Sequence, residues 1–268
     1  MKKKNIIIFN IGHRDLEFTE PVTIKNKEIE KFLPKNHDDN FRDNSKYVLD
    51  HYDEFAKVIS FPFIEKTFRY LARRSEQKIN TIYLFASDQE PPHDITDTIY
   101  IPQIFKKYLN DLRRHEDWSK ILDVVEKPKI RVINKSPADL DVMNQYYDGF
   151  FSELKERDQV HKVYISTTGG TPAMNNMAWF NGIKYFQDDV ECVYLPYQHR
   201  SPKMLNIGKK LVQETYIRSL KENLDVYEYY AAWYFLESVA EKFSNKSVFR
   251  SVLYLLKYCH QRLSFNFD

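Results

Sequence analysis

The chain has 268 residues, of which 43% are hydrophobic and 15% aromatic. Such a chain is long enough to bury a core and too rich in apolar groups to remain disordered. Its 40 Lys and Arg residues are nearly balanced by 38 Asp and Glu residues, which leaves a formal net charge of +2. Because no strong positive field surrounds it, composition argues against a general binder of duplex nucleic acid, and an anionic ligand must be held by local groups.

The cysteines and the N-terminus carry little chemistry of their own. Cys192 and Cys259 lie far apart in the sequence, outside any CxxC pair or cluster of metal ligands, so we expect two small buried residues, no metal and no cofactor. The apolar run at residues 6–9 is too short for a signal-peptide core or a membrane span. A cytoplasmic protein is therefore expected.

Strand and helix patterns alternate through the first two-thirds of the chain. Short β-branched or aromatic runs predict buried strands at residues 5–9, 81–86, 129–134, 162–166 and 191–195. Apolar residues at helical spacing predict helices within residues 55–74, 98–112 and 140–154. This order predicts an α/β, Rossmann-like fold with a mostly parallel sheet flanked by helices, whose ligand site lies beyond the carboxyl ends of the strands.

The last part of the chain has a different pattern. Residues 211–220, 227–243 and 248–263 predict consecutive helices rich in Tyr and Phe, so residues 206–268 are expected to form a small all-helical unit after a main domain of residues 1–205. We interpret this unit as a connector or a dimerisation segment. The final apolar run, residues 263–268, would ordinarily pack on something further along, so we expect the chain to be a fragment of a longer protein.

The most distinctive segment runs from the fourth predicted strand into a helix. It contains adjacent glycines, Gly169 and Gly170, followed by Thr171 as a helix N-cap and Pro172 at the first helical position. Free backbone N–H groups at the helix start can bind a phosphate together with nearby hydroxyls. Those hydroxyls belong to Ser166, Thr167, Thr168 and Thr171. The alternative is a purely structural strand-to-helix turn.

Two common nucleotide-binding motifs are absent from the sequence. No Lys of a P-loop follows the glycines, and no G-x-G-x-x-G sequence occurs. We therefore expect a site that binds phosphates without hydrolysing a triphosphate.

The segment that ends at Met174 resembles the late strand-turn-helix motif, S/T-G-G-T-x-x-M, of CARF domains (CRISPR-associated Rossmann fold) in type III CRISPR ancillary proteins. The resemblance extends to the turns at residues 10–15 and 86–89 and covers residues 1–205. It implies a homodimer that binds one cyclic tetra- or hexa-adenylate across its two-fold axis. The sequence does not distinguish the two ring sizes.

The resemblance also implies ligand contacts on the two earlier turns. On the first, Arg14 could pair with a phosphate or with Asp15, and His13 could contact an adenine or remain solvated. On the second, a mixture of donors and acceptors could read an adenine edge or cap a helix. The candidates on these turns are Asn10, Gly12, His13, Arg14, Ser87, Asp88 and Gln89.

Two further loops are weaker candidates. Lys135 could touch a phosphate, although Pro137 is expected to begin a helix there. Residues 198–200 and Lys203 form either a mobile lid or an ordinary surface loop.

The leading hypothesis is a cyclic oligoadenylate sensor that signals to an attached effector in antiviral defence. A ring nuclease is an alternative, with metal-independent attack by a ligand 2′-hydroxyl and charge stabilisation by Ser166, Thr167 or Arg14, but no catalytic base is identified. A transcription regulator ranks last because no basic recognition helix is evident. The Arg and His pair of the ribonucleases fused to many CARF proteins is not found, so enzymatic activity stays open.

Overall fold

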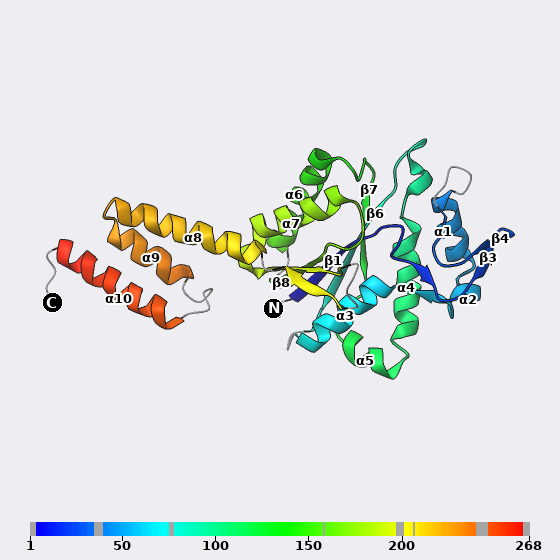
Figure 1. The fold of residues 1–268 in the computed structure, drawn as a ribbon, viewed down its shortest axis with the longest axis horizontal. Coiled ribbons are helices and arrows are strands. Elements are labelled where there is room, and N and C mark those ends of the chain that lie inside the picture. The colour runs from blue at the N-terminus through cyan, green and yellow to red at the C-terminus, as the bar shows by residue number, and fades with distance from the viewer. Residues whose placement is uncertain are drawn as a thin grey trace. The chain divides into compact units, whose positions relative to one another are not determined.

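A computed structural model describes residues 4–34, 40–74, 78–157, 159–196, 201–205, 207–239 and 246–264 (Figure 1). The chain divides into two compact units, Met1–Leu205 and Asn206–Asp268. The first unit carries every candidate ligand-binding residue predicted from the sequence.

A six-stranded sheet in the order β10-β9-β8-β1-β6-β7 forms the centre of the first unit. All neighbouring strands are parallel except β10, which pairs antiparallel with β9 at one edge. The strands are β1 (Lys4–Asn10), β6 (Thr81–Ser87), β7 (Lys129–Ile133), β8 (Val160–Ser166), β9 (Val190–Tyr194) and β10 (Lys203–Leu205). The mostly parallel α/β prediction is confirmed, and β10 is an edge strand that the sequence patterns did not indicate.

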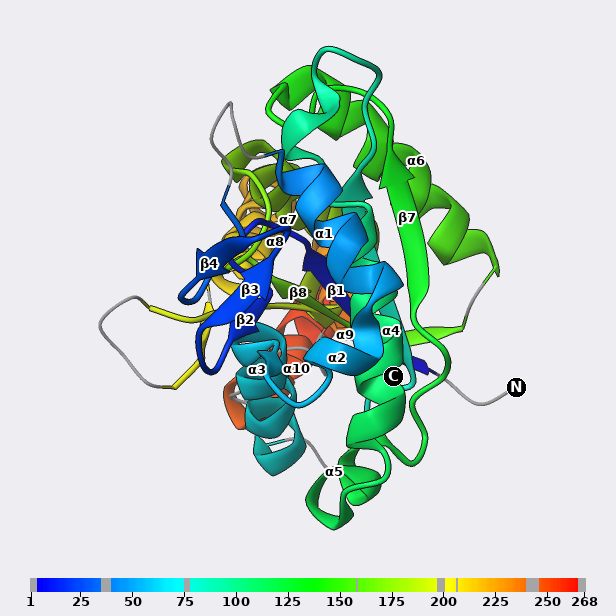
Figure 2. The same cartoon turned by 90° about the vertical axis from the view of Figure 1, so that its right-hand side faces the viewer.

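Helices cover both faces of the sheet (Figures 1 and 2). The side chains of β1 alternate, because Ile7 and Phe9 pack in one buried cluster while Ile6 and Ile8 pack in the other. The first cluster includes residues of α1 (Phe41–Asp50), α2 (Tyr52–Phe55), α3 (Pro62–Arg74), α4 (Tyr100–Leu112) and α5 (Glu116–Leu122). The second includes residues of α6 (Leu140–Arg157) and α7 (Pro172–Phe186).

Small elements complete the described part of this unit. They are the two-stranded pairs β2 (Glu17–Phe18) with β5 (Ile59–Ser60) and β3 (Val22–Ile24) with β4 (Lys27–Ile29), and the 3₁₀ turns η1 (Asp94–Thr96) and η2 (Gln187–Asp189). Helix α1 packs against α4 and lies near β3 (Figure 2).

Three local expectations need correction. The helix predicted within residues 55–74 begins only at Pro62, because Ile59 and Ser60 form the short strand β5. Pro137 does not begin a helix: α6 starts at Leu140, where the Asp139 carboxylate accepts a hydrogen bond from the N–H of Val142. Cys192 is buried, which raises its pKa to about 12, whereas Cys259 is only partly buried.

The second unit contains helices α8 (Ile207–Asp225), α9 (Tyr229–Val239) and α10 (Lys246–Leu263). A small core forms where Ala232, Leu236 and Val239 of α9 meet Leu256 of α10. Helix α9 begins at Tyr229 rather than Tyr227, which has a positive φ of 60°. Among the helices of the described ranges, none is long and apolar enough to cross a membrane.

The side of the sheet on which successive strands are added changes at β1. From β1 the sheet extends first through β6 to β7 on one side, and then α6 leads back to β8 on the other side. In open α/β sheets such a switch point leaves a crevice beyond the carboxyl ends of the two strands. Here those ends carry the β1 loop (residues 11–16) and the glycine turn (residues 167–171), so the topology brings the predicted phosphate turn to the place where such sheets bind ligands.

Candidate functional site

The glycine turn connects β8 to α7 as the sequence predicted. Thr171 is the N-cap of α7, where its Oγ1 accepts a hydrogen bond of 3.2 Å from the N–H of Met174, and Pro172 is the first helical residue. Gly170 has a φ of +69°, a conformation that L side chains rarely adopt. In the described part of the chain, the backbone N–H groups of Gly169 and Gly170 donate to no protein acceptor. They are therefore available to an anion.

The β1 loop and the glycine turn are in direct backbone contact. A Cβ atom built at Gly12 would lie 2.8 Å from the backbone nitrogen of Gly170, and one built at Gly169 would lie 2.2 Å from the carbonyl oxygen of Asn10. Both distances are too short for a real side chain. Each glycine is therefore needed for the two loops to meet, whether or not a ligand also approaches them.

A chain of side-chain hydrogen bonds stabilises the contact between the β1 loop and the glycine turn. Tyr147 of α6 donates its hydroxyl to Oδ1 of Asn10 at 2.5 Å, and Nδ2 of Asn10 donates to Oδ1 of Asn175 at 2.9 Å. Asn175 in turn donates from Nδ2 to the carbonyl of Gly169 at 2.6 Å. Because Asn10 is only 1% exposed and its amide is bonded at both ends, its side chain holds the loops together rather than facing solvent.

Asp15 is a buried carboxyl beside the same contact. Its Oδ2 accepts a hydrogen bond of 2.6 Å from the N–H of Gly12, and the side chain lies against Gly169. Burial raises the pKa of Asp15 to about 7, and the Gly12 hydrogen bond opposes that rise. No local feature of the sequence distinguishes this buried carboxyl from an ordinary surface partner of Arg14.

The hydroxyls predicted to surround the phosphate turn are largely engaged by the protein. Thr168 Oγ1 accepts from the N–H of Leu195 at 2.9 Å, and Thr171 Oγ1 also donates to the carbonyl of Pro137. Ser166 is 2% exposed and so does not face solvent. Thr167 is partly buried, and its backbone N–H donates to the carbonyl of Val193 at 2.9 Å. The backbone N–H groups of Gly169 and Gly170 are thus less engaged by the protein than the hydroxyls of Thr168 and Thr171.

The other two candidates on the β1 loop differ in their surroundings. The ring of His13 lies 4.5 Å from that of Phe41, and its Nε2 is 2.7 Å from the carbonyl oxygen of Thr96. Arg14 is exposed, and Asp15 turns away from it toward Gly12. Arg14 therefore remains the cation on this loop that could reach a phosphate.

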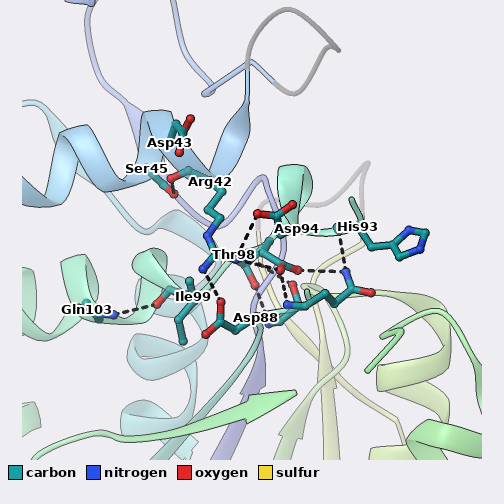
Figure 3. Close-up of polar contacts among 12 residues, drawn as sticks. Arg42, Asp43, Ser45, Asp88, His93, Asp94, Thr98, Ile99 and Gln103 are labelled. Atoms are coloured by element: carbon teal, nitrogen blue, oxygen red, sulfur yellow. Dashed lines mark hydrogen bonds and ion pairs between the residues drawn. The ribbon is translucent and has the colours of Figure 1, made fainter. Parts of the chain in front are cut away.

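The third set of candidates lies after β6 and is held by Arg42, which was not among the residues predicted from the sequence. Arg42 of α1 pairs with Asp88 at 2.7 Å, with Asp97 at 3.4 Å and with Asp94 at 3.8 Å (Figure 3). Asp97 is fully buried and accepts from the backbone N–H of Gln89. The β6 loop (residues 88–99) is thereby fixed to α1.

The remaining contacts of the β6 loop are internal. Ser87 is buried and its Oγ accepts from the N–H of Thr98 at 3.3 Å, while Nε2 of Gln89 donates to Oδ1 of Asp97 and to the carbonyl of His93, both at 3.1 Å. Asp88 is 35% exposed and so can still face a ligand. No local pattern in the sequence marks Arg42, the second residue of α1, as a partner of the loop that follows β6.

Residues 198–200 of the predicted lid fall outside the described residues. Within the described ranges, no group of three His, Cys, Asp or Glu side chains could hold a metal ion. Lys135 is exposed after β7.

Comparison with known proteins supports the fold. No protein-family model and no curated protein matches the chain. A solved structure, Csm6 of Enterococcus italicus bound to cyclic hexa-2′-fluoro-hexa-dAMP, matches 100% of this chain and 57% of its own chain, with 15% sequence identity and a TM-score of 0.55. The chain thus spans little more than half the length of that protein. The likeness confirms the predicted α/β, Rossmann-like fold.

Proposed function

We propose that this chain is a sensor domain that binds a cyclic oligoadenylate at the β1 loop and the glycine turn. The observation that carries the proposal is the meeting of these two loops at the switch point of a CARF-like sheet, with unbonded N–H groups of Gly169 and Gly170 at the start of α7. A helix start with free N–H groups favours a phosphate over a neutral ligand. The likeness to a structure solved with a bound cyclic hexanucleotide analogue supports this ligand class.

The candidate residues take different parts in the proposed complex. The glycine turn binds a phosphate through its backbone, and Arg14 pairs with a second phosphate from the β1 loop. On the β6 loop, Asp88 accepts a hydrogen bond from the amino group of an adenine. Its Oδ1 pairs with Arg42, which leaves Oδ2 to accept from the ligand. Asn10, Ser87, Ser166 and Thr171 support these loops from buried or bonded positions.

We further propose that two copies of the chain share one ring. A cyclic oligomer of identical units is symmetric, and a two-fold axis through the ring places the same loops of both copies against equivalent nucleotides. Signal transmission then requires that the ring bind one arrangement of the dimer more tightly than another, since equal affinity shifts no population. The helices of residues 206–268 are the segment through which we expect an attached effector to respond.

Binding without cleavage is favoured over a ring nuclease. Ser166, one of the groups suggested to stabilise developing charge, is buried. The Asp15 carboxylate is also buried and accepts a hydrogen bond from the N–H of Gly12. Cleavage of the ring would have to rely on positioning by Thr167 or Arg14 alone.

Calorimetry with purified protein tests the function directly. Cyclic tetra-adenylate, cyclic hexa-adenylate, linear hexa-adenylate and ATP are titrated separately, and light scattering is recorded with and without each ligand. We expect one of the two rings to bind at one ring per two chains, and ATP to bind weakly or not at all. Tight ATP binding with no heat from either ring would contradict the proposal, and a monomer saturated at one ring per chain would contradict the shared site.

A further inference from the structure

The Asp15 carboxyl lies against the glycine turn, and within the described part of the chain it forms no ion pair. It is 3% exposed, and its hydrogen bond comes from the backbone N–H of Gly12 at 2.6 Å. Its Oδ2 would lie 2.5 Å from a Cβ atom built at Gly169 and 3.6 Å from one built at Gly12. The carboxyl is therefore wedged between the two loops that form the proposed phosphate site.

A buried carboxylate without a counter-ion carries a large desolvation cost, which a proton removes. Burial is the main cause of the raised pKa of about 7, and among the described residues no charged side chain contributes to that rise. A pKa near 7 means that the charge of this carboxyl changes close to neutral pH.

We propose that Asp15 is a positioning residue for the glycine turn and that binding of an anionic ligand at this turn is coupled to uptake of a proton by the Asp15 carboxyl. The proposal rests on the phosphate site of the proposed function and adds its regulation. A phosphate bound to the N–H groups of Gly169 and Gly170 brings a negative charge close to Asp15. That charge stabilises the protonated carboxyl over the carboxylate.

The direction of the effect follows from linkage. Below pH 7 the carboxyl already holds its proton in the ligand-free protein, and affinity for the anion depends little on pH. Above pH 7 the ligand-free protein has lost the proton and must regain it on binding, so affinity falls as the pH rises, by at most about tenfold per pH unit for each Asp15.

His13 and Arg14 share the β1 loop with Asp15. The His13 ring contacts Thr96 and Phe41, and the Arg14 side chain is exposed. The glycine turn, residues 167–171, and Asn10 at the end of β1 contain no titratable side chain. His13 is thus the group whose titration must be separated from that of Asp15.

The experiment measures ring affinity and proton uptake together. Cyclic hexa-adenylate, or the tetra-adenylate if that ring binds more tightly, is titrated by calorimetry between about pH 6 and pH 8.5 in buffers of different ionisation enthalpy, which reports the protons taken up per ring. The proteins are wild type, Asp15→Asn, His13→Gln and Asp117→Asn. Asp117 is the control carboxylate and lies on α5. The chain runs from α5 into the start of β7, so Asp117 precedes the amino end of a strand, whereas the two loops follow carboxyl ends.

We expect wild type and Asp117→Asn to take up protons above pH 7 and to lose affinity there. Asp15→Asn keeps an acceptor for Gly12 but cannot titrate, so its affinity stays constant over this range. His13→Gln retains the uptake. If Asp15→Asn fails to fold, uptake by wild type and by His13→Gln still decides the matter.

The outcomes that overturn the proposal differ from the failure of the proposed function. Ring binding without proton uptake, uptake that persists in Asp15→Asn, or uptake that disappears in His13→Gln contradicts the role of Asp15 while leaving the sensor function intact. Absence of ring binding at every pH contradicts the sensor function and this inference together.

Discussion

Gly170 lies directly against Asn10, so that a Cβ atom built on Gly170 would be 2.6 Å from the Cβ of Asn10. Gly170 also has a φ of +69°. The position thus excludes a side chain for two independent reasons, crowding and backbone conformation. One arises between residues far apart in the sequence, and the other arises within the turn itself.

Gly170→Ala should therefore weaken both the fold and ring binding. We expect a loss of unfolding free energy of about 1–3 kcal/mol, because the turn must shift away from Asn10 or adopt a different φ, and a large loss of affinity because the N–H groups of the turn move with it. Denaturant unfolding and calorimetry measure the two effects. Gly149→Ala is the control: Gly149 lies on α6 with open space around its Cα, and alanine there should raise stability by about 0.5–1 kcal/mol. A Gly170→Ala protein with unchanged stability and affinity would show that the turn is permissive.

Asn175→Ala tests the amide that links Asn10 to the glycine turn. The variant leaves Nδ2 of Asn10 and the carbonyl of Gly169 without their partner, so we expect destabilisation of about 1–3 kcal/mol and weaker ring binding. Asn176→Ala changes the adjacent, exposed asparagine and should alter neither property. Equal effects of the two substitutions would mean that the Asn175 bonds contribute nothing beyond helix propensity.

The raised pKa of Asp15 predicts how the free energy of unfolding changes with pH in the absence of any ligand. Its pKa is raised from 3.8 to about 7 on folding, so its favourable contribution is complete below pH 3.8 and is lost as the pH rises toward 7. Relative to Asp15→Asn, wild type should lose up to about 4 kcal/mol of unfolding free energy between pH 4 and pH 8. Urea unfolding of both proteins at several pH values provides the comparison, since other titrating groups cancel in the difference. A difference that is constant with pH would place the carboxyl in water.

The Arg42 and Asp88 pair should be energetically coupled. The two side chains are 22% and 35% exposed and lie 2.7 Å apart, and Arg42 also approaches Asp97. A double-mutant cycle of Arg42→Met and Asp88→Asn should give a coupling energy of about 1–2 kcal/mol. The exposed i,i+4 pair of Lys120 and Glu116 is the control, for which we expect about 0.3–0.5 kcal/mol. Equal coupling in the two pairs would mean that α1 does not fix the β6 loop.

Features that depend on neighbouring residues could be predicted from the sequence alone. The strand ending at Ser166, the capping of α7 by Thr171 and the place of Pro172 follow from local rules, because a helix N-cap acts on an N–H only three residues away. The mostly parallel sheet also follows, since alternating strand and helix patterns leave few other ways to bury both kinds of apolar face.

Only the tertiary structure decided which of the candidate groups are available to a ligand. Asn10 and Asn175 are 165 positions apart, and the hydrogen bond that removes Asn10 from solvent has no trace in the local pattern of either residue. The same holds for Arg42, whose carboxylate partners follow β6, and for Asp15, whose burial depends on Gly169. Local propensity determines where a turn forms, but the partners of its polar groups are set by which strands become neighbours in the sheet, and that choice depends on packing of the whole domain.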